Sequence, residues 1–275
     1  MQLVGQMLSQ IIHGKALEDI YSGLKLYPVY TLLAWTDVKN RYRRTKLGPF
    51  WLTISMGVFI SAVGLLYAGI FGNRGSNYIP YFGTGVIIWT YLNNTVQDQC
   101  DTFINSTAIA QNIDIPRSIF IFRTLVRSLI VLAHNCVIII LLLLIFKIEI
   151  NLSILSSFGG IILISLNGLF VGMLFGIMCL RYRDLPHMIA SGMQIMFFLT
   201  PILWQTNIFE ITDPRISLIS LNPFYHFIEI VRLPLIAGEV ASSISWSIAL
   251  FFTSCFGLMA TYFYHKKFRR IGLWL

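Results

Sequence analysis

The sequence predicts an all-α integral membrane protein with six transmembrane helices. Hydrophobic residues make up 56% of the 275 residues, whereas soluble domains contain about 45–50% apolar residues. Several uncharged apolar runs approach the roughly 20 residues that a helix needs to cross a bilayer. With both termini in the cytoplasm, every lysine and arginine falls on the cytoplasmic side except Arg74, Lys147, Arg215 and Arg232. This bias is the one that orients membrane proteins, so it explains the formal net charge of +8 without nucleic acid.

Residues 1–47 are predicted to form a cytoplasmic N-terminal arm with an amphipathic helix at the membrane interface. Leu17, Ile20 and Leu24 recur at about helical spacing among charged and polar residues. An arm that packs only on protein is the alternative. No signal peptide is apparent, so the N-terminus is expected to stay in the cytoplasm. The arm ends in DVKNRYRRTKLGPFW, Asp37 to Trp51, where the membrane surface is expected to pass between the arginines and the tryptophan.

Residues 48–275 are predicted to form a single six-helix transmembrane domain. The connection from Asn105 to Ser118 is too polar to span, so a short cytoplasmic helix is expected there. The RYRD sequence from Arg181 to Asp184 predicts a compact cytoplasmic turn. The six spans are expected at about residues 49–71, 78–96, 119–146, 152–180, 185–204 and 244–264.

Two short re-entrant helices are predicted between the fifth and sixth spans. The apolar runs there are of about 10–14 residues, a length more typical of interfacial or re-entrant segments than of spans. Asn222 and Pro223 suit the N-cap and first position of the second short helix. Glu229 and Arg232 are three residues apart and are expected to neutralise each other on one face.

Gly168, Gly172 and Gly176 repeat every fourth residue in the fourth predicted span. This doubled G-x-x-x-G pattern predicts a close approach of another helix, with a hinge as the alternative.

The sequence lacks the residue patterns of an ATPase or an enzyme. Gly14-Lys15, the only Gly-Lys pair, has neither the earlier glycine nor the hydroxyl of a P-loop. The histidines and cysteines have no metal-binding spacing. His134 stands in the third predicted span, either as a proton relay or as a hydrogen-bonded side chain between helices. No metal site, cofactor or catalytic residue is therefore expected on this chain, and active transport would need an ATPase partner.

Four segments in chain order resemble the permease subunit of bacterial ABC exporters for cell-surface polysaccharide. They are DVKNRYRRTKLGPFW, NSTAIAQNIDIPRS, LRYRDLPHMIASGMQIMFFLTPILW and NPFYHFIEIVRLPLIAG. That family exports O-antigen, capsule and teichoic acid, and the chain looks most like the O-antigen permeases. The resemblance extends over essentially the whole chain.

The resemblance implies a homodimeric permease in the bacterial inner membrane, with two nucleotide-binding ATPase subunits that carry the ATP and Mg. It implies export of a polysaccharide linked to undecaprenyl diphosphate, without an enzyme site on this chain. ATPase coupling would involve the loop residues Gln111, Asn112, Asp114, Pro116 and Arg117, and the turn residues Arg181, Arg183 and Asp184. The exit would be shaped by re-entrant helices over residues 208–235, which include Asn222, Pro223, Glu229 and Arg232.

A polysaccharide path needs aromatic faces and hydrogen-bonding groups. Candidates for the path are Tyr42, Trp51, Tyr67, Tyr81, Trp89 and Tyr91, with the ordinary aromatic belt of membrane interfaces as the alternative. Arg41, Arg43 and Arg44 are candidates to meet the lipid diphosphate at a cytoplasmic gate, or else only to set topology.

Two other functions remain open at this stage. One is a type-2 ABC permease for lipid or drug efflux. The other is a membrane-embedded transferase acting on lipid-linked sugar, which would need a catalytic acid or base such as Asp98 or Asp101.

Overall fold

The computed structural model describes residues 15–41, 43, 45–71, 78–206 and 218–274, and every regular element among them is helical. This confirms the all-α prediction. The helices are α2 (Lys15–Lys25), α3 (Tyr27–Arg41), α4 (Phe50–Phe71), α5 (Tyr78–Cys100), α6 (Thr107–Asn112), α7 (Ser118–Ile145), α8 (Ile154–Val171), α9 (Ile177–Arg181), α10 (Leu185–Leu199), α12 (Pro223–Ile236) and α13 (Ser243–Trp274). A π-helical turn, Gly172–Gly176, joins α8 to α9.

Four helical segments within the described residues are long and apolar enough to cross a membrane. They are Phe50–Ile70, Ser118–Ile145, Ile154–Arg181 and Ser243–Phe268. The two other predicted spans coincide with α5 and α10, neither of which is both long enough and apolar enough to count among these segments. Helix α5 is long, but its second half is polar, and α10 is apolar but has only 15 residues. The chain is thus a membrane protein, and a count of six spans goes beyond what the helices show.

Helix α10 ends earlier than the sequence predicted. The predicted fifth span runs to residue 204, but the helix stops at Leu199. Thr200 is extended, with φ −96° and ψ 136°. It precedes Pro201, whose ring disfavours helical geometry in the residue before it. The last helix is longer than predicted. The predicted sixth span ends at residue 264, but α13 continues through the basic residues that follow and ends at Trp274.

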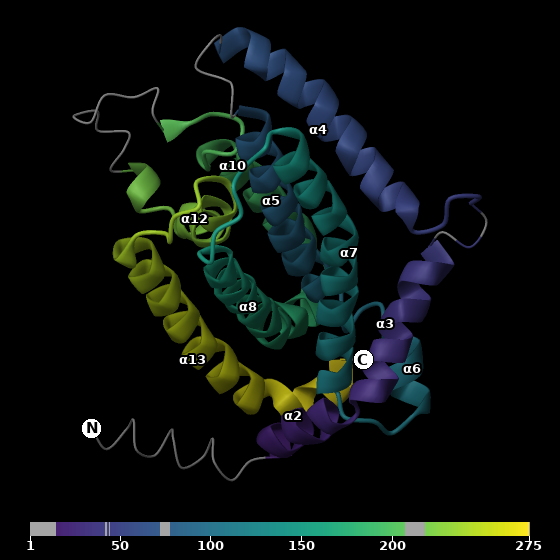
Figure 1. Cartoon of the computed structure of the whole chain (residues 1–275). Coiled ribbons are helices and arrows are strands. Elements are labelled where there is room, and N and C mark those ends of the chain that lie inside the picture. Colours follow the sequence, from purple (N-terminus) through teal and green to yellow (C-terminus); the bar gives the residue numbers. More distant parts are fainter. Residues whose placement is uncertain (1–14, 42, 44, 72–77, 207–217, 275) are drawn as a thin grey trace.

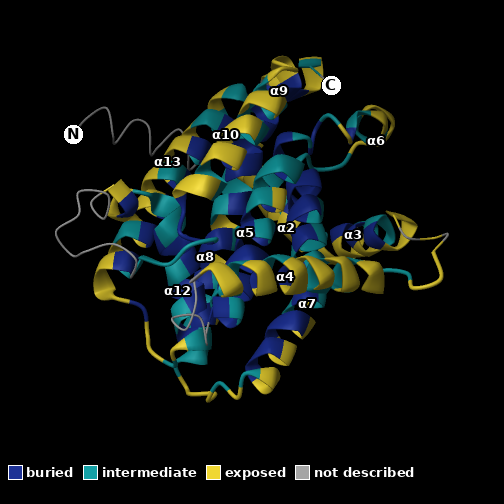
Figure 2. Ribbon diagram, turned by 90° about the horizontal axis from the view of Figure 1, so that it is seen from above, coloured by how far each residue is buried: buried dark blue, intermediate teal, exposed yellow. Residues whose placement is uncertain are grey.

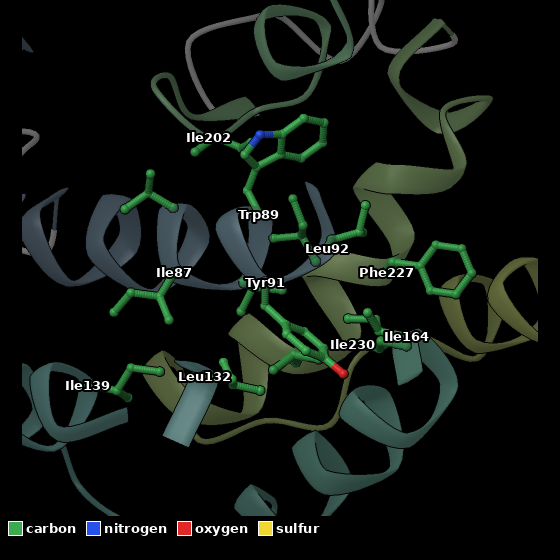
Figure 3. Close-up of a cluster of buried hydrophobic side chains, with 14 of the residues drawn as sticks. Ile87, Trp89, Tyr91, Leu92, Leu132, Ile139, Ile164, Ile202, Phe227 and Ile230 are labelled. Carbon is green, nitrogen blue, oxygen red and sulfur yellow. The ribbon is translucent and has the colours of Figure 1, made fainter. Parts of the chain in front are cut away.

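Helix α5 runs through the centre of the molecule, and α4 lies at the side, where its Phe59 ring is 6.1 Å from the Phe82 ring of α5 (Figure 1). Most of α5 is buried, whereas α4 exposes apolar residues along most of its length (Figure 2). Figure 3 shows Trp89 and Tyr91 on opposite sides of α5, within a cluster that also includes Leu132, Ile164 and Phe227. The two sides of α5 therefore face different parts of the protein.

The glycines of the G-x-x-x-G pattern lie against α5. A Cβ at Gly168 would collide with Thr95, and one at Gly172 would collide with the side-chain oxygen of Gln99. At Gly176 it would stand 3.1 Å from the backbone oxygen of Gln99. Small residues let helix backbones approach closely in a membrane, where packing replaces the hydrophobic effect. The close approach is therefore to α5, and the π-helical turn begins and ends at two of the same glycines.

The N-terminal arm contains two described helices that pack on α7. Tyr30, Ala34 and Val38 of α3 are buried at four-residue spacing, and the Tyr30 ring lies 5.4 Å from that of Phe122. Leu32 and Trp35 on the opposite side of α3 are exposed. The arm thus packs on protein with one face and leaves apolar side chains on the other.

Candidate functional site

A groove runs between α5 and α10, with a volume of about 590 Å³. Helix α5 contributes Trp89, Asn93 and Gln97, which are spaced four residues apart and so share one face. The residues from α10 are His187, Ala190, Ser191, Met193, Gln194, Phe197 and Phe198. We call this hollow the α5–α10 groove.

The α5–α10 groove combines ring faces with amide groups. The Trp89 ring lies 5.8 Å from that of Phe197, and the Gln97 side-chain nitrogen donates to Asn93 Oδ1 at 2.9 Å. Amides can both donate and accept hydrogen bonds, and aromatic rings offer apolar faces. A ligand that presents hydroxyl groups beside apolar ring faces would match this lining.

Only Trp89 among the described sugar-path candidates lines the α5–α10 groove. Trp51 is exposed on α4, and Tyr67 stacks on Tyr78. Tyr81 donates its hydroxyl to the oxygen of Pro201, and Tyr91 shares a 2.7 Å hydrogen bond with Ser165 in the core. Tyr42 lies outside the described residues.

Sequence reasoning missed Asn93, Gln97, His187 and Gln194 as groove residues. The signal was available, because polar residues recur at helical spacing along one face of each helix. What the sequence did not contain was the pairing of these two faces, which depends on how α10 packs on α5.

A charged network joins α3, α5 and α7. Arg123 donates two hydrogen bonds to the Asp37 carboxylate, at 2.8 and 2.7 Å. Arg127, one turn further along α7, lies 3.8 Å from Asp37 and 3.1 Å from Asp98. Bidentate pairs between Arg and a carboxylate are strong and geometrically specific. The network fixes the start of the Asp37–Trp51 stretch against α7.

Of the two acids considered for the transferase function, Asp98 has a neighbour that opposes that role. Asp98 is paired with Arg127. Burial raises the pKa of Asp101, with a further increase from the charge of Asp98 and a decrease from His187. A carboxylate already bound to a guanidinium is a poor general base, because the pairing stabilises its charged form.

Of the three arginines predicted at the cytoplasmic gate, the structure describes Arg41 and Arg43. Arg41 lies at the end of α3 beside this network, and Arg43 is exposed in the following turn. Arg44 lies outside the described residues.

Asp19 of α2 connects the arm to two other helices. Its carboxylate accepts the backbone N–H of Arg117 at 2.7 Å and that of Ser118 at 2.9 Å, at the start of α7. The Tyr264 hydroxyl of α13 donates to the same carboxylate at 3.0 Å. A negative charge at a helix N-terminus satisfies free N–H groups and interacts favourably with the helix dipole. We call this group of contacts the Asp19 latch.

The predicted coupling residues lie next to the Asp19 latch. Gln111, Asn112 and Asp114 are exposed on and after α6. Pro116 is half-buried, and Arg117 turns inward, where it donates to the backbone oxygen of Phe268 at 2.9 Å. Of the predicted coupling residues in this loop, Gln111, Asn112 and Asp114 are therefore exposed, whereas Arg117 is turned inward.

The RYRD turn is also exposed. Arg181, Arg183 and Asp184 are all exposed, and the Arg181 guanidinium lies 5.1 Å from the ring of Trp274. Figure 2 shows α6, α9 and the C-terminus on the same side of the molecule. The two predicted coupling segments thus share one end of the fold.

The predicted exit segment contains a buried ion pair. The side chain of Asn222 accepts the N–H of Phe224 at 3.0 Å and caps α12, which confirms the predicted N-cap. Arg232 donates to Glu229 at 2.7 Å and to the Pro201 oxygen at 2.9 Å. Its guanidinium stands 3.8 Å from the centre of the Tyr81 ring. The predicted pair is therefore present, and it also connects α12 to α5 and to the end of α10.

The first of the two predicted re-entrant helices falls mainly on residues 207–217, which lie outside the described residues. Helix α12 corresponds to the second.

Comparison with known proteins gives a family match and two similar relatives. A family model described as ABC-2 type transporter matches residues 28–236. Two proteins of Klebsiella pneumoniae, both named O-antigen export system permease protein RfbA, are 24% and 22% identical to this chain over 202 residues. Each alignment covers 72% of this chain and 76% of the relative.

Proposed function

The chain belongs to the ABC-2 type transporter family, and we propose that it is the channel-forming permease of an ATP-driven exporter of lipid-linked polysaccharide. The resemblance found in the sequence is confirmed at the level of the family. The chain is thus a membrane transport subunit related to O-antigen export permeases. The substrate we propose is an O-antigen chain on undecaprenyl diphosphate.

The observation that carries the proposal is the α5–α10 groove. Successive units of a sugar chain must slide past the protein, so the path needs many weak contacts rather than one tight pocket. The exposed Phe198 ring and the partly buried Phe197 ring beside the amides of Gln97 and Gln194 supply such contacts, whereas Trp89 is buried behind them. In a homodimer of six-span subunits, we infer that the two grooves face a common path.

The proposed assembly includes two ATPase subunits bound at the end that holds α6 and α9. ATP and Mg belong to those subunits. We place this assembly in the inner membrane with both termini of the permease in the cytoplasm, because of the charge bias. Helices α5 and α10 complete the six spans, and the segment that includes α12 re-enters from the outer face.

Transport by reconstituted vesicles tests the proposal. Permease and its ATPase are placed in vesicles with lipid-linked glycan, and glycan movement and ATP hydrolysis are measured together. Gln97→Leu should lower the glycan transport rate roughly two- to tenfold, the range expected from the loss of one hydrogen bond. Asn151→Leu, at an exposed position outside the groove, is the matched control.

Hydrolysis without any glycan movement would refute polysaccharide export. Movement of a short-chain lipid or drug in the same vesicles would then support the efflux alternative. Glycan transfer to an acceptor without translocation would support the transferase.

A further inference from the structure

A second hollow, with a volume of about 290 Å³, lies where α5, α8, α10, α12 and α13 meet. Its buried wall includes Leu92, Ile164 and Phe227 (Figure 3). An apolar cavity of about 150 Å³ is enough to take up a benzene molecule, so this hollow has room for part of a hydrocarbon chain. We call it the phenylalanine hollow, after the five phenylalanines that line it: Phe175, Phe224, Phe227, Phe252 and Phe256.

The phenylalanine hollow has an apolar lining. Among the described residues no charged side chain lines it, and the polar side chains that do are those of Thr95 and Asn167. Asn167 donates to the Thr253 hydroxyl at 2.7 Å and to the Leu163 oxygen at 2.9 Å, and Thr95 places its methyl group against Gly168. Apolar cavities stay dry, because water needs polar partners. The occupant that suits this lining is therefore apolar.

The phenylalanine hollow lies at the middle of two candidate spans. Phe252 and Phe256 are near the centre of Ser243–Phe268, and Ile164 is near the centre of Ile154–Arg181. Phe252 is 40% exposed, so the hollow reaches the outer surface of the helices at this residue. The middle of a bilayer contains hydrocarbon rather than water or headgroups. The depth of the opening thus favours a hydrocarbon chain.

The phenylalanine hollow and the α5–α10 groove are neighbours. Met193 of α10 lines both. The ring of Trp89, which lines the groove, lies 5.7 Å from the ring of Phe224, which lines the hollow. A lipid-linked glycan joins a polar chain to an isoprenoid chain, so its two parts need neighbouring sites of opposite polarity. This adjacency favours the isoprenoid chain of the substrate over the acyl chain of an ordinary membrane lipid.

We propose that the phenylalanine hollow binds a segment of the isoprenoid chain of the lipid-linked substrate, beside the groove that takes its glycan. The choice of an isoprenoid chain rests on the proposed function. The volume, the lining and the depth point to a hydrocarbon chain without it.

Photocrosslinking from two adjacent positions of α13 tests the proposal. Phe252 lines the hollow, whereas Phe251 is exposed on the same helix and lies outside the lining. In the full-length chain each is replaced in turn by p-benzoylphenylalanine, which on irradiation bonds to nearby C–H groups. The purified permease is placed in vesicles of phosphatidylethanolamine and phosphatidylglycerol with a small mole fraction of undecaprenyl phosphate. Lipid adducts are then identified by mass spectrometry.

The ratio of undecaprenyl adducts to phospholipid adducts should be severalfold higher at position 252 than at position 251. Equal ratios would overturn the proposal, because the hollow would then take whichever chain the bilayer supplies. Phospholipid adducts alone at position 252, or no adducts there, would also overturn it.

A variant that fills the hollow gives a second measurement. Ile189 is half-buried in the α10 wall, so Ile189→Trp places a larger side chain in the hollow. In the chain labelled at position 252, this change should lower the undecaprenyl adducts severalfold. Ile195→Trp is the matched control, because Ile195 is exposed on the same helix outside the lining. Undiminished undecaprenyl adducts in Ile189→Trp, at a melting temperature equal to that of the control, would count against the site.

The outcomes separate this inference from the proposed function, because the adducts are measured without the ATPase and without transport. Glycan transport in vesicles together with equal adduct ratios at positions 251 and 252 would overturn the isoprenoid site and leave export standing. Enrichment at position 252 without glycan transport would support the site and count against export.

Discussion

The Asp19 carboxylate on α2 accepts the backbone N–H of Arg117 at a distance of 2.7 Å, across 98 residues of sequence. Arg117 is the residue at which the predicted coupling loop ends and α7 begins. An acid in the N-terminal arm thus caps the helix that follows the loop. Since Tyr264 of α13 binds the same carboxylate, displacement of the loop acts on the arm and on the last helix together.

The first prediction concerns this carboxylate. Asp19→Ala leaves the N–H groups of Arg117 and Ser118 without their acceptor. Loss of such a cap costs about 0.5–2 kcal/mol, so the melting temperature of the purified permease should fall. Glu18→Ala, at the neighbouring exposed position, is the control and should have little effect. Equal melting temperatures for the two variants would contradict the importance of the latch.

The second prediction separates coupling from folding. Asp114 is exposed, whereas Arg117 is bonded to Phe268. Asp114→Lys should therefore retain membrane insertion and ATP hydrolysis but lose export, because it reverses a charge on the surface offered to the ATPase. Arg117→Glu should also lower stability, because it removes the bond to Phe268 and adds a charge beside Asp19.

Export and hydrolysis, measured on the same membranes, check the coupling prediction. Glu149→Lys reverses an exposed charge in another loop and serves as the control. Normal export by Asp114→Lys would show that the loop does not couple the two subunits.

The third prediction concerns the ion pair of α12. Arg232 is 2% exposed and pairs with Glu229, so removal of one partner leaves the other partly buried and unpaired. Breaking a buried pair in this way typically costs about 3–5 kcal/mol. In a double-mutant cycle, Glu229→Gln and Arg232→Met should be non-additive by more than about 1 kcal/mol.

For the cycle of Glu229 and Arg232, the free energy of unfolding of the original chain, the two single variants and the double variant is measured by detergent titration. A second cycle with Lys147→Met and Glu149→Gln, two exposed loop residues, should be additive. Additive effects at Glu229 and Arg232 would mean that the pair contributes nothing beyond its separate members.

The fourth prediction uses the close approach of α5 to the π-helical turn. A Cβ at Gly172 meets the Gln99 side chain and Ile121, so Gly172→Ala overpacks a buried contact. Overpacking costs typically about 1–3 kcal/mol. Gly192→Ala is the matched control, because a Cβ there meets nothing within 4 Å. The control should be neutral or slightly stabilising, and a similar loss of stability in both variants would rule out the packing explanation.

Local sequence patterns predicted the helices well. The helices over Phe50–Phe71, Ser118–Ile145 and Ile154–Arg181 begin and end close to the predicted bounds. Asn222 caps α12 as predicted, and Glu229 pairs with Arg232. These features depend on residues within one or two helical turns of each other, so periodicity and capping chemistry were sufficient to find them.

Contacts between distant segments could not be predicted in this way. Arg123 and Arg127 were counted as cytoplasmic charges that orient the chain, but they lie in α7 and bind Asp37 and Asp98. Charge bias is a property of loops and gives no partner for an individual arginine. The α5–α10 groove was missed for the same reason, since it depends on the relative positions of two helices that are far apart in sequence.

The Asp19 latch also bears on the order in which the subunit is made. Synthesis proceeds from the N-terminus, so Asp19 emerges long before the start of α7 that it caps. Its bond to Tyr264 becomes possible only when α13, separated from it by 245 positions, has left the ribosome. The bonds from Arg117 and Ser118 to this carboxylate can therefore form before the bond from Tyr264 can. Complete satisfaction of Asp19 marks a subunit whose first and last described helices have both reached their final places.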